Sequence, residues 1–302
     1  NRVAMLYSVD AYHALEFMPF NKGGGGGANL PSWQFPPRGF HEPVTGTDYM
    51  TIFRQLHETL YRLNVGVDLV FPQTESFADY DVLVVPALYV ASDALLGRLV
   101  DFVEGGGHLL LTFKSGFADE HSRVRWSRAP GPLREAAGVS YQEFSTLKTP
   151  LPLAGDPFGV GDQNRVSVWA DMLLPEGAEV LARYDHHFFE QFPALTRNAH
   201  GQGTLTWQGT VLSDALQEAV LRDILSRAGL TGPDQDLPAP VRLRQGMGRE
   251  GKAIRYYLNF SRKPQAFGYP HADGVDLLTG AAIEKGGQVT LEPWGLVIVE
   301  EG

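Results

Sequence analysis

The sequence contains no cysteine among its 302 residues. Disulfide bonds, thiolate nucleophiles and zinc sites built on thiolates are therefore excluded. A chain that forms no disulfide fits a cytosolic protein, although secreted proteins can also lack cysteine. We therefore expect a cytoplasmic protein.

Long apolar runs and clusters of basic residues are also missing. No segment approaches the roughly 20 apolar residues that a membrane-spanning helix needs, so we expect no membrane partner. The 25 Lys and Arg residues are outnumbered by 35 Asp and Glu residues, which gives a formal net charge of −10. Because the basic residues do not gather in any segment, we expect no nucleic-acid partner.

Short apolar, β-branched segments alternate with helical patterns in the first part of the chain. Such segments are typical of strands buried on both faces of a parallel sheet. The alternation predicts a doubly wound, flavodoxin-like α/β sheet. The pattern places strands at 2–8, 65–71, 80–86 and 108–113, and helices at 47–64, with Thr47 as N-cap, and 92–107. Between the first strand and the first of these helices, 20–46 is a glycine- and proline-rich loop.

The pattern becomes richer in strands after residue 138 and ends the first domain with an amphipathic helix at 213–230. The segment 231–240 is rich in Pro, Gly and Asp and has no apolar periodicity, so we interpret it as a linker. Short strands separated by turns follow, which predicts a small antiparallel all-β domain. We place the domains at 1–232 and 233–302.

The stretch "GGGHLLLTFKSGFAD" (105–119) ends a predicted strand in Lys114 and Ser115, at the edge where α/β folds place their sites. Ser115 lacks the G-x-S-x-G spacing of a hydrolase nucleophile. A triad of Ser115, Asp119 and His121 would lie within seven positions of one loop, a spacing that seldom gives triad geometry. We therefore interpret this turn as structural and assign no catalytic residue.

Other candidate sites are weaker. Asp10, His13 and Glu16 follow the first strand at helical spacing, so they share one helix face that could contact a ligand or a neighbouring chain. The nine histidines form no metal-binding motif, and Gly105–Gly107 precede a strand instead of joining a strand to a helix. We expect no metal and no cofactor. No pair of carboxylates stands out for glycoside hydrolysis.

Several motifs, taken together, resemble the middle region of family 42 β-galactosidases. These motifs are Ala14-Leu15-Glu16, the phrase from Gly106 to Glu120, and "PGPLRE" from Pro130 to Glu135 followed by Gly138. "HGQGTLTWQGT" (200–210) is similar to the next marker of that family, and the terminal strands resemble its small C-terminal domain.

The resemblance implies a particular domain plan. Family members carry an N-terminal (β/α)8 barrel with both catalytic glutamates, a trimerisation domain of class I glutamine amidotransferase-like fold, and a C-terminal β-domain. The resemblance identifies 1–232 as the trimerisation domain and 233–302 as the β-sandwich. Since the sequence starts at Asn1, where the barrel should end, we expect a chain that is inactive by itself. The parent enzyme would hydrolyse terminal non-reducing β-D-galactose residues.

The resemblance also implies a homotrimer in which the loops of one subunit help to close a neighbour's sugar pocket. It leads us to expect six residues near a subunit interface or pocket rim: Asp10, His13, Glu16, Lys114, Ser115 and Asp119. Galactosides would be bound through the parent enzyme. Two alternatives remain open: a free-standing amidotransferase-like hydrolase that uses Ser115 or an unrecognised acid pair, and a carbohydrate-binding module that uses Trp33, Trp126 or Trp169.

Overall fold

The computed structural model describes residues 1–17 and 49–302, and the side chains of the first segment as far as Leu15. The predicted loop at 20–46 and the N-cap Thr47 lie outside this range. The chain forms two compact units, Asn1–Thr59 with Val67–Ala228, and Leu60–Gly66 with Gly229–Gly302. No helix in the described ranges is long and apolar enough to cross a membrane.

The first unit is built on a seven-stranded mixed sheet of order β2-β1-β3-β4-β11-β10-β9. The neighbours from β2 to β11 are parallel, and β10 and β9 extend the sheet in antiparallel fashion. The strands β1 and β3 are buried throughout, as the continuous apolar segments predict. The bounds are β1 (Val3–Leu6), β2 (Val67–Val70), β3 (Val82–Val85), β4 (His108–Thr112), β9 (Glu179–Arg183), β10 (Pro193–His200) and β11 (Gly203–Gln208).

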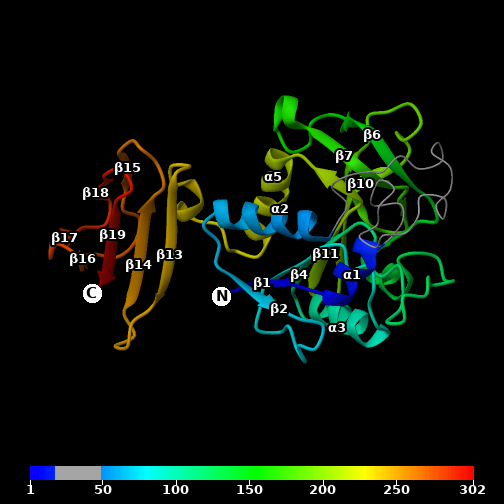
Figure 1. Cartoon of the computed structure of the whole chain (residues 1–302), viewed down its shortest axis with the longest axis horizontal. Coiled ribbons are helices and arrows are strands. Elements are labelled where there is room, and N and C mark those ends of the chain that lie inside the picture. The colour runs from blue at the N-terminus through cyan, green and yellow to red at the C-terminus, as the bar shows by residue number, and fades with distance from the viewer. Residues whose placement is uncertain (18–48) are drawn as a thin grey trace. The chain divides into compact units, whose positions relative to one another are not determined.

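The helices cover both faces of this sheet. In Figure 1, α2 and α5 lie on one side of the sheet and α3 lies on the other. Hydroxyl caps define where two of them begin: Ser92 accepts from the backbone N–H of Leu95, and Ser213 accepts from that of Leu216, both at 3.2 Å. The bounds are α1 (Val9–Phe17), α2 (Tyr49–Arg62), α3 (Asp93–Glu104), α4 (Arg134–Ala137) and α5 (Asp214–Arg227).

Two smaller sheets complete the first unit. One has the order β12-β7-β6 and the other pairs β5 with β8. The end of β7 and the start of β6 carry side chains that form one wall of the pocket described below. The bounds are β5 (Val139–Ser140), β6 (Phe144–Pro152), β7 (Arg165–Asp171), β8 (Leu174–Pro175) and β12 (Thr210–Leu212).

The second unit is all-β, apart from a short 3-10 turn at Pro233–Asp236 and the segment 60–66. Its sheets have the orders β13-β14-β19-β16-β17 and β15-β18, and its core contains Val241, Leu243, Tyr257, Tyr269, Val289, Leu291 and Val299. Asn64 joins this unit because its side chain accepts from Leu243 N at 2.9 Å and donates to Asp234 O at 3.0 Å. The bounds are β13 (Val241–Met247), β14 (Ala253–Asn259), β15 (Gln265–Gly268), β16 (Gly274–Asp276), β17 (Ala282–Ile283), β18 (Gln288–Leu291) and β19 (Leu296–Glu301).

Candidate functional site

The turn after β4 is joined to the segment after β3 by a row of hydrogen bonds. Leu88 donates its backbone N–H to Ser115 Oγ at 3.1 Å and accepts from Gly116 N at 2.9 Å. Further along, Ala118 N donates to Tyr89 O at 2.9 Å. Because β3 and β4 are adjacent and parallel, their carboxyl ends meet at one edge of the sheet. The two segments therefore form a single, closely bonded edge.

Lys114 begins this turn, and its backbone is left-handed, with φ of 65°. This conformation is uncommon for a residue with a β-carbon and costs free energy that the surrounding contacts must offset. The side chain turns into the protein, where it is 3% exposed, and Nζ lies 4.1 Å from the centre of the Trp169 ring. Lys114 thus makes a cation–π contact inside the unit.

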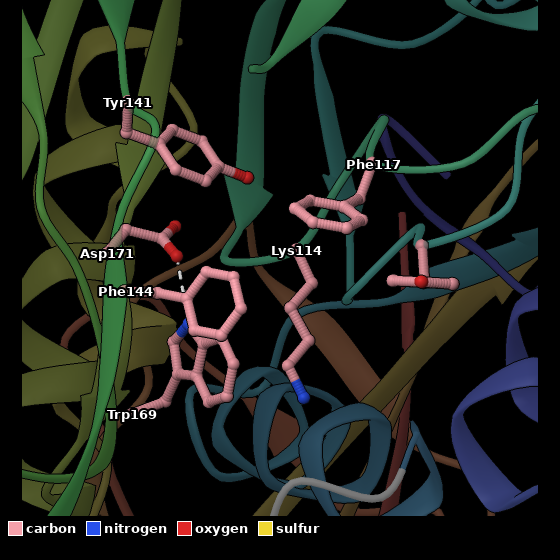
Figure 2. Close-up of a pocket in the computed structure, with 7 residues that line it drawn as sticks. Lys114, Phe117, Tyr141, Phe144, Trp169 and Asp171 are labelled. Atoms are coloured by element: carbon pink, nitrogen blue, oxygen red, sulfur yellow. Dashed lines mark hydrogen bonds between the residues drawn. The ribbon is translucent and has the colours of Figure 1, made fainter. Parts of the chain in front are cut away.

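Lys114 lines a small pocket with mostly aromatic walls. Figure 2 shows Phe144, Trp169, Asp171 and Tyr141 on one side of the pocket, facing Lys114 and Phe117. The rings of Phe144 and Trp169 stack with centroids 4.6 Å apart. The cavity has a volume of about 10 Å³, which is room for about one water molecule. A sugar ring does not fit in this space.

Asp171 is fully buried in the wall of this pocket. Its two carboxylate oxygens accept from the indole nitrogens of Trp169 at 2.8 Å and Trp207 at 3.2 Å. Burial raises the pKa of Asp171 to about 7, against the opposing effects of the two indole donors and the charge of Lys114. Within the described part of the chain, the buried hydroxyl of Tyr141 has no hydrogen-bond partner.

The amine of Lys114 is perturbed in the opposite direction. Burial lowers the pKa of Lys114 to about 7, and the charge of Asp171 opposes this shift. The pKa values of the amine and of the carboxyl group therefore both lie near 7. The space beside them admits about one water molecule, so this pair has no room for a substrate of the size of a sugar.

The hydroxyl of Ser115 has a structural role. It is fully buried, donates to Thr112 O at 2.7 Å and accepts from Leu88 N. Asp119, the acid of the triad considered above, accepts from the backbone N–H groups of His121 at 2.9 Å and Arg123 at 3.0 Å. Ser115 and Asp119 therefore each close a turn.

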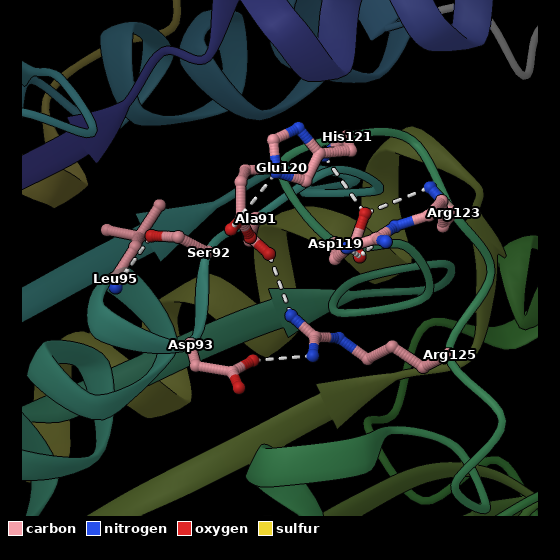
Figure 3. A network of polar contacts seen from close by, with 9 residues as sticks. All are labelled: Ala91, Ser92, Asp93, Leu95, Asp119, Glu120, His121, Arg123 and Arg125. Carbon is pink, nitrogen blue, oxygen red and sulfur yellow. Dashed lines mark hydrogen bonds and ion pairs between the residues drawn. The ribbon is translucent and has the colours of Figure 1, made fainter.

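A loop beyond this turn is held down by charged side chains, as Figure 3 shows. The side chain of Arg123 pairs with Asp119 at 2.8 Å. The partial burial of Asp119 acts to raise its pKa. Its hydrogen bonds with Arg123 and with the backbone together have the larger effect, so the pKa of Asp119 is lowered. Arg125 donates to Ala91 O at 2.8 Å and pairs with Asp93 at the start of α3. The loop is thus tied to the sheet edge and to a helix.

The six residues that sequence analysis selected lie in different environments. Asp10 and His13 are exposed on α1, as the predicted helix requires. Glu16 belongs to the same helix, and its side chain lies outside the described residues. Lys114 and Ser115 are buried within the unit, while Asp119 is partly exposed. Their place at a subunit interface stays a prediction.

Sequence analysis missed Asp171 and Tyr141, which line the same pocket as Lys114. Asp171 ends the strand pattern "RVSVWAD", and nothing in that pattern distinguishes a buried carboxylate from one at a solvated strand end. Tyr141 lies in a segment that reads as an ordinary strand. Among the described residues, no group of three or more His, Asp or Glu side chains could hold a metal ion.

Comparison with family models assigns both parts of the chain. Residues 1–231 match the model described as β-galactosidase trimerisation domain, and residues 249–301 match the model described as β-galactosidase C-terminal domain. The α/β unit and the all-β unit follow each other in the same order. The chain belongs to the family 42 glycoside hydrolase β-galactosidases and comprises the non-catalytic trimerisation and C-terminal domains of that family.

Individual relatives agree with this assignment. β-Galactosidase Pbg of Clostridium perfringens is 27% identical over 83% of this chain and 37% of its own length. β-Galactosidase BgaA of Clostridium cellulovorans is 27% identical over 99% of this chain and 41% of its own length. The structure of β-galactosidase from Bacillus circulans sp. alkalophilus superposes with a TM-score of 0.80 at 23% identity, and covers 100% of this chain and 41% of its own. The 302 residues therefore span about two-fifths of the length of these relatives.

Proposed function

We propose that this chain is the assembly part of a β-galactosidase, which joins three subunits and completes the sugar pocket of a neighbouring subunit. The parent enzyme would hydrolyse terminal non-reducing β-D-galactose residues with catalytic glutamates that a separate barrel domain supplies. One observation carries the proposal. The turn where an α/β enzyme would place a nucleophile is filled by the hydrogen-bonded Ser115 hydroxyl and a pocket the size of one water molecule.

The topology of the first unit supports an amidotransferase-like, flavodoxin-like origin. The parallel strands follow the order β2-β1-β3-β4-β11, which corresponds to the flavodoxin order 2-1-3-4-5. Folds of this class bind substrates at the carboxyl edge of the sheet. We propose that this edge serves assembly here, because its turns are closed by hydrogen bonds between the segments after β3 and β4.

We propose that the exposed polar groups near this edge define the register between subunits. Asp10 and His13 face outward on α1, and Asp119 is held in a fixed position by Arg123. Polar groups at the rim of an interface contribute specificity and orientation more than affinity. A cytoplasmic trimer would agree with the cysteine-free composition.

Two measurements on the purified chain test this proposal. Sedimentation equilibrium over a wide concentration range is expected to show a reversible trimer, and a strict monomer at high concentration would contradict it. A chromogenic galactoside is expected to remain uncleaved. Turnover that disappears when a carboxylate of this chain is replaced would contradict the non-catalytic assignment.

One observation favours a second candidate, a carbohydrate-binding module. Trp126 is completely exposed, and an exposed aromatic ring can stack on a sugar. Trp169 is buried and cannot serve in this way, and Trp33 lies outside the described residues. Galactose-dependent thermal stabilisation of the isolated chain would support this candidate, and its loss in Trp126→Ala would identify the binding residue.

A further inference from the structure

A cavity of about 240 Å³ lies beside the loop 124–131 of the first unit. Phe117 and Tyr141 line both this cavity and the water-sized pocket around Lys114. Pockets for drug-sized ligands have volumes of about 300–1,000 Å³. The cavity therefore has room for a small organic molecule, which the pocket around Lys114 does not have.

The walls of this cavity are positively charged. The guanidinium groups of Arg125 and Arg128 line it, and within the described part of the chain no Asp or Glu side chain lines it. The carboxylate that pairs with Arg125 belongs to Asp93, which is not a lining residue. Since the chain as a whole has a formal net charge of −10, this positive cavity differs from the rest of the molecule. Its charge favours an anionic ligand.

Arg128 is held in place and only weakly neutralised. Its carboxylate partner, Glu176, lies 3.9 Å away and already accepts two hydrogen bonds from Arg134, at 2.6 and 2.7 Å. A hydrogen bond of 2.8 Å to Gln142 orients the guanidinium of Arg128 and uses one of its five N–H donors. A guanidinium oriented in this way can bind a carboxylate through two parallel N–H groups.

Two buried donors belong to residues that line the cavity. In the described part of the chain, neither Arg125 Nε nor the hydroxyl of Tyr141 has a hydrogen-bond partner. Burial raises the pKa of Tyr141 well above its ordinary value, so its hydroxyl keeps its proton and is able to donate. Buried polar groups without partners are rare in folded proteins and call for a partner such as a water molecule or an ion. These two donors support a ligand that supplies acceptor atoms.

The same cavity offers aromatic surfaces to a ring. Phe117 and Tyr141 form part of its walls, and Trp126, whose side chain is completely exposed, lies at its rim. The loop that carries Trp126 is held on both sides, because Arg125 N donates to Phe117 O at 3.0 Å and Ala129 forms a bridge with Tyr141. A site held in this way loses little conformational entropy when a ligand binds.

We propose that this cavity binds a small ring compound that carries a carboxylate group, with the carboxylate on Arg128 and the ring against Trp126. The inference goes beyond the proposed assembly function and does not rest on it. The guanidinium group selects a planar carboxylate, and the aromatic surfaces select a ring over a bare inorganic anion. A sugar acid and an aromatic acid share this chemistry.

Isothermal titration calorimetry of the whole 302-residue chain gives the first test. Galacturonate, benzoate, galactose and inorganic phosphate are titrated separately. At least one of the two carboxylates is expected to bind more tightly than galactose and phosphate, by about tenfold or more, and to bind more weakly as the salt concentration rises. Binding of galacturonate alone identifies a sugar acid, and binding of benzoate alone identifies an aromatic acid. Equally tight binding of galactose or phosphate, or no binding of either carboxylate, would overturn the inference.

Substitutions locate the site. Arg128→Gln is expected to raise the dissociation constant of the bound carboxylate by about tenfold or more, and Trp126→Ala by about 2- to 10-fold. Arg249→Gln and Trp294→Ala are the matched controls and should leave it unchanged, because both residues are exposed and lie in the second unit. Carboxylate binding that neither Arg128→Gln nor Trp126→Ala weakens would overturn the location of the site.

Thermal unfolding of each variant shows whether a loss of binding is a loss of fold. If Arg128→Gln does not fold, Arg128→Lys takes its place, because lysine keeps the charge but cannot form two parallel hydrogen bonds with a carboxylate. Arg128→Lys is expected to bind the carboxylate more weakly than the unmodified chain. Unchanged affinity in Arg128→Lys would overturn the role of the guanidinium group.

Discussion

Lys114 Nζ, from the turn that follows β4, lies 4.1 Å from the centre of the ring of Trp169 in β7. The indole nitrogen of Trp169 donates in turn to the buried Asp171. One aromatic residue therefore contacts both the perturbed amine and the perturbed carboxyl group. This arrangement makes the stability of the first unit sensitive to pH and to each of the three side chains.

The first prediction concerns pH. Asp171 has an ordinary pKa of 3.8 and a folded pKa of about 7, so the folded chain holds the extra proton between these values and the free energy of unfolding falls as pH rises. Lys114 has an ordinary pKa of 10.5 and a folded pKa of about 7, so the unfolded chain holds the extra proton between these values and the free energy of unfolding rises with pH. The two residues together therefore contribute least to the free energy of unfolding near neutral pH.

Urea denaturation at a series of pH values measures this effect. Asp171→Asn is expected to remove the fall in the free energy of unfolding between pH 3.8 and about 7, which we call the acidic limb. Lys114→Met is expected to remove the rise between about 7 and 10.5, which we call the alkaline limb. Lys252→Met, at a partly exposed lysine of the second unit, should retain both limbs. An acidic limb that persists unchanged in Asp171→Asn would contradict the assignment to this carboxyl group.

The second prediction concerns the indole donor. Trp169→Phe removes the N–H group that donates to Asp171 at 2.8 Å and keeps an aromatic ring in the stack with Phe144. We expect the pKa of Asp171 to rise further and the free energy of unfolding to fall by about 1–3 kcal/mol where the carboxylate is charged. Denaturation at acidic and alkaline pH measures the difference, and an equal loss at both would indicate a packing defect instead.

The third prediction concerns Ser115. Ser115→Ala leaves the buried N–H group of Leu88 without its acceptor, so we expect the free energy of unfolding to fall by about 1–3 kcal/mol. Ser127→Ala, at an exposed serine, is the control and should change stability little. A Ser115→Ala chain that kept its stability and lost a hydrolase activity would indicate a nucleophile and restore the amidotransferase-like alternative.

The fourth prediction concerns the segment 60–66 of the second unit. Asn64 combines a left-handed backbone, with φ of 57°, and side-chain hydrogen bonds to Leu243 and Asp234. Both Asn64→Gly and Asn64→Ala remove the two side-chain hydrogen bonds. Glycine adopts the left-handed backbone without strain, whereas alanine adds backbone strain there. We expect Asn64→Ala to be less stable than Asn64→Gly by about 1–2 kcal/mol. Thermal unfolding of both variants tests this, and equal stability would show that backbone strain contributes nothing.

Much of the fold could be predicted from local patterns. The continuous apolar segments correspond to β1, β3 and β4, and the hydroxyl caps Ser92 and Ser213 lie where helical periodicity begins. The small all-β part after residue 240 was also predicted. The segments of β9 and β10 also have a strand pattern, but their antiparallel place at the edge of the large sheet was not predicted, because a strand pattern does not identify the sheet that the strand joins.

The candidate site could be predicted only in part. The glycine-containing turn at Lys114 and Ser115 was found because it follows an apolar strand. The burial of both side chains was not predicted, because polar residues in a turn are mostly exposed. Asp171 was missed because its pKa is raised by burial, and this burial depends on residues remote in sequence, such as Trp207 and Lys114, that pack around it.

By itself, the sequence determined the positions of most helices and strands and the resemblance to family 42 β-galactosidases, because hydrophobic periodicity and motif spacing are local properties. Only the tertiary structure decided which of the polar residues are buried and which aromatic side chains remain exposed. Burial depends on residues brought together from distant parts of the chain, as in the Lys114, Trp169 and Asp171 contact. The full exposure of Trp126 is likewise a property of the folded surface, since the same residue type is buried at Trp169 and Trp207.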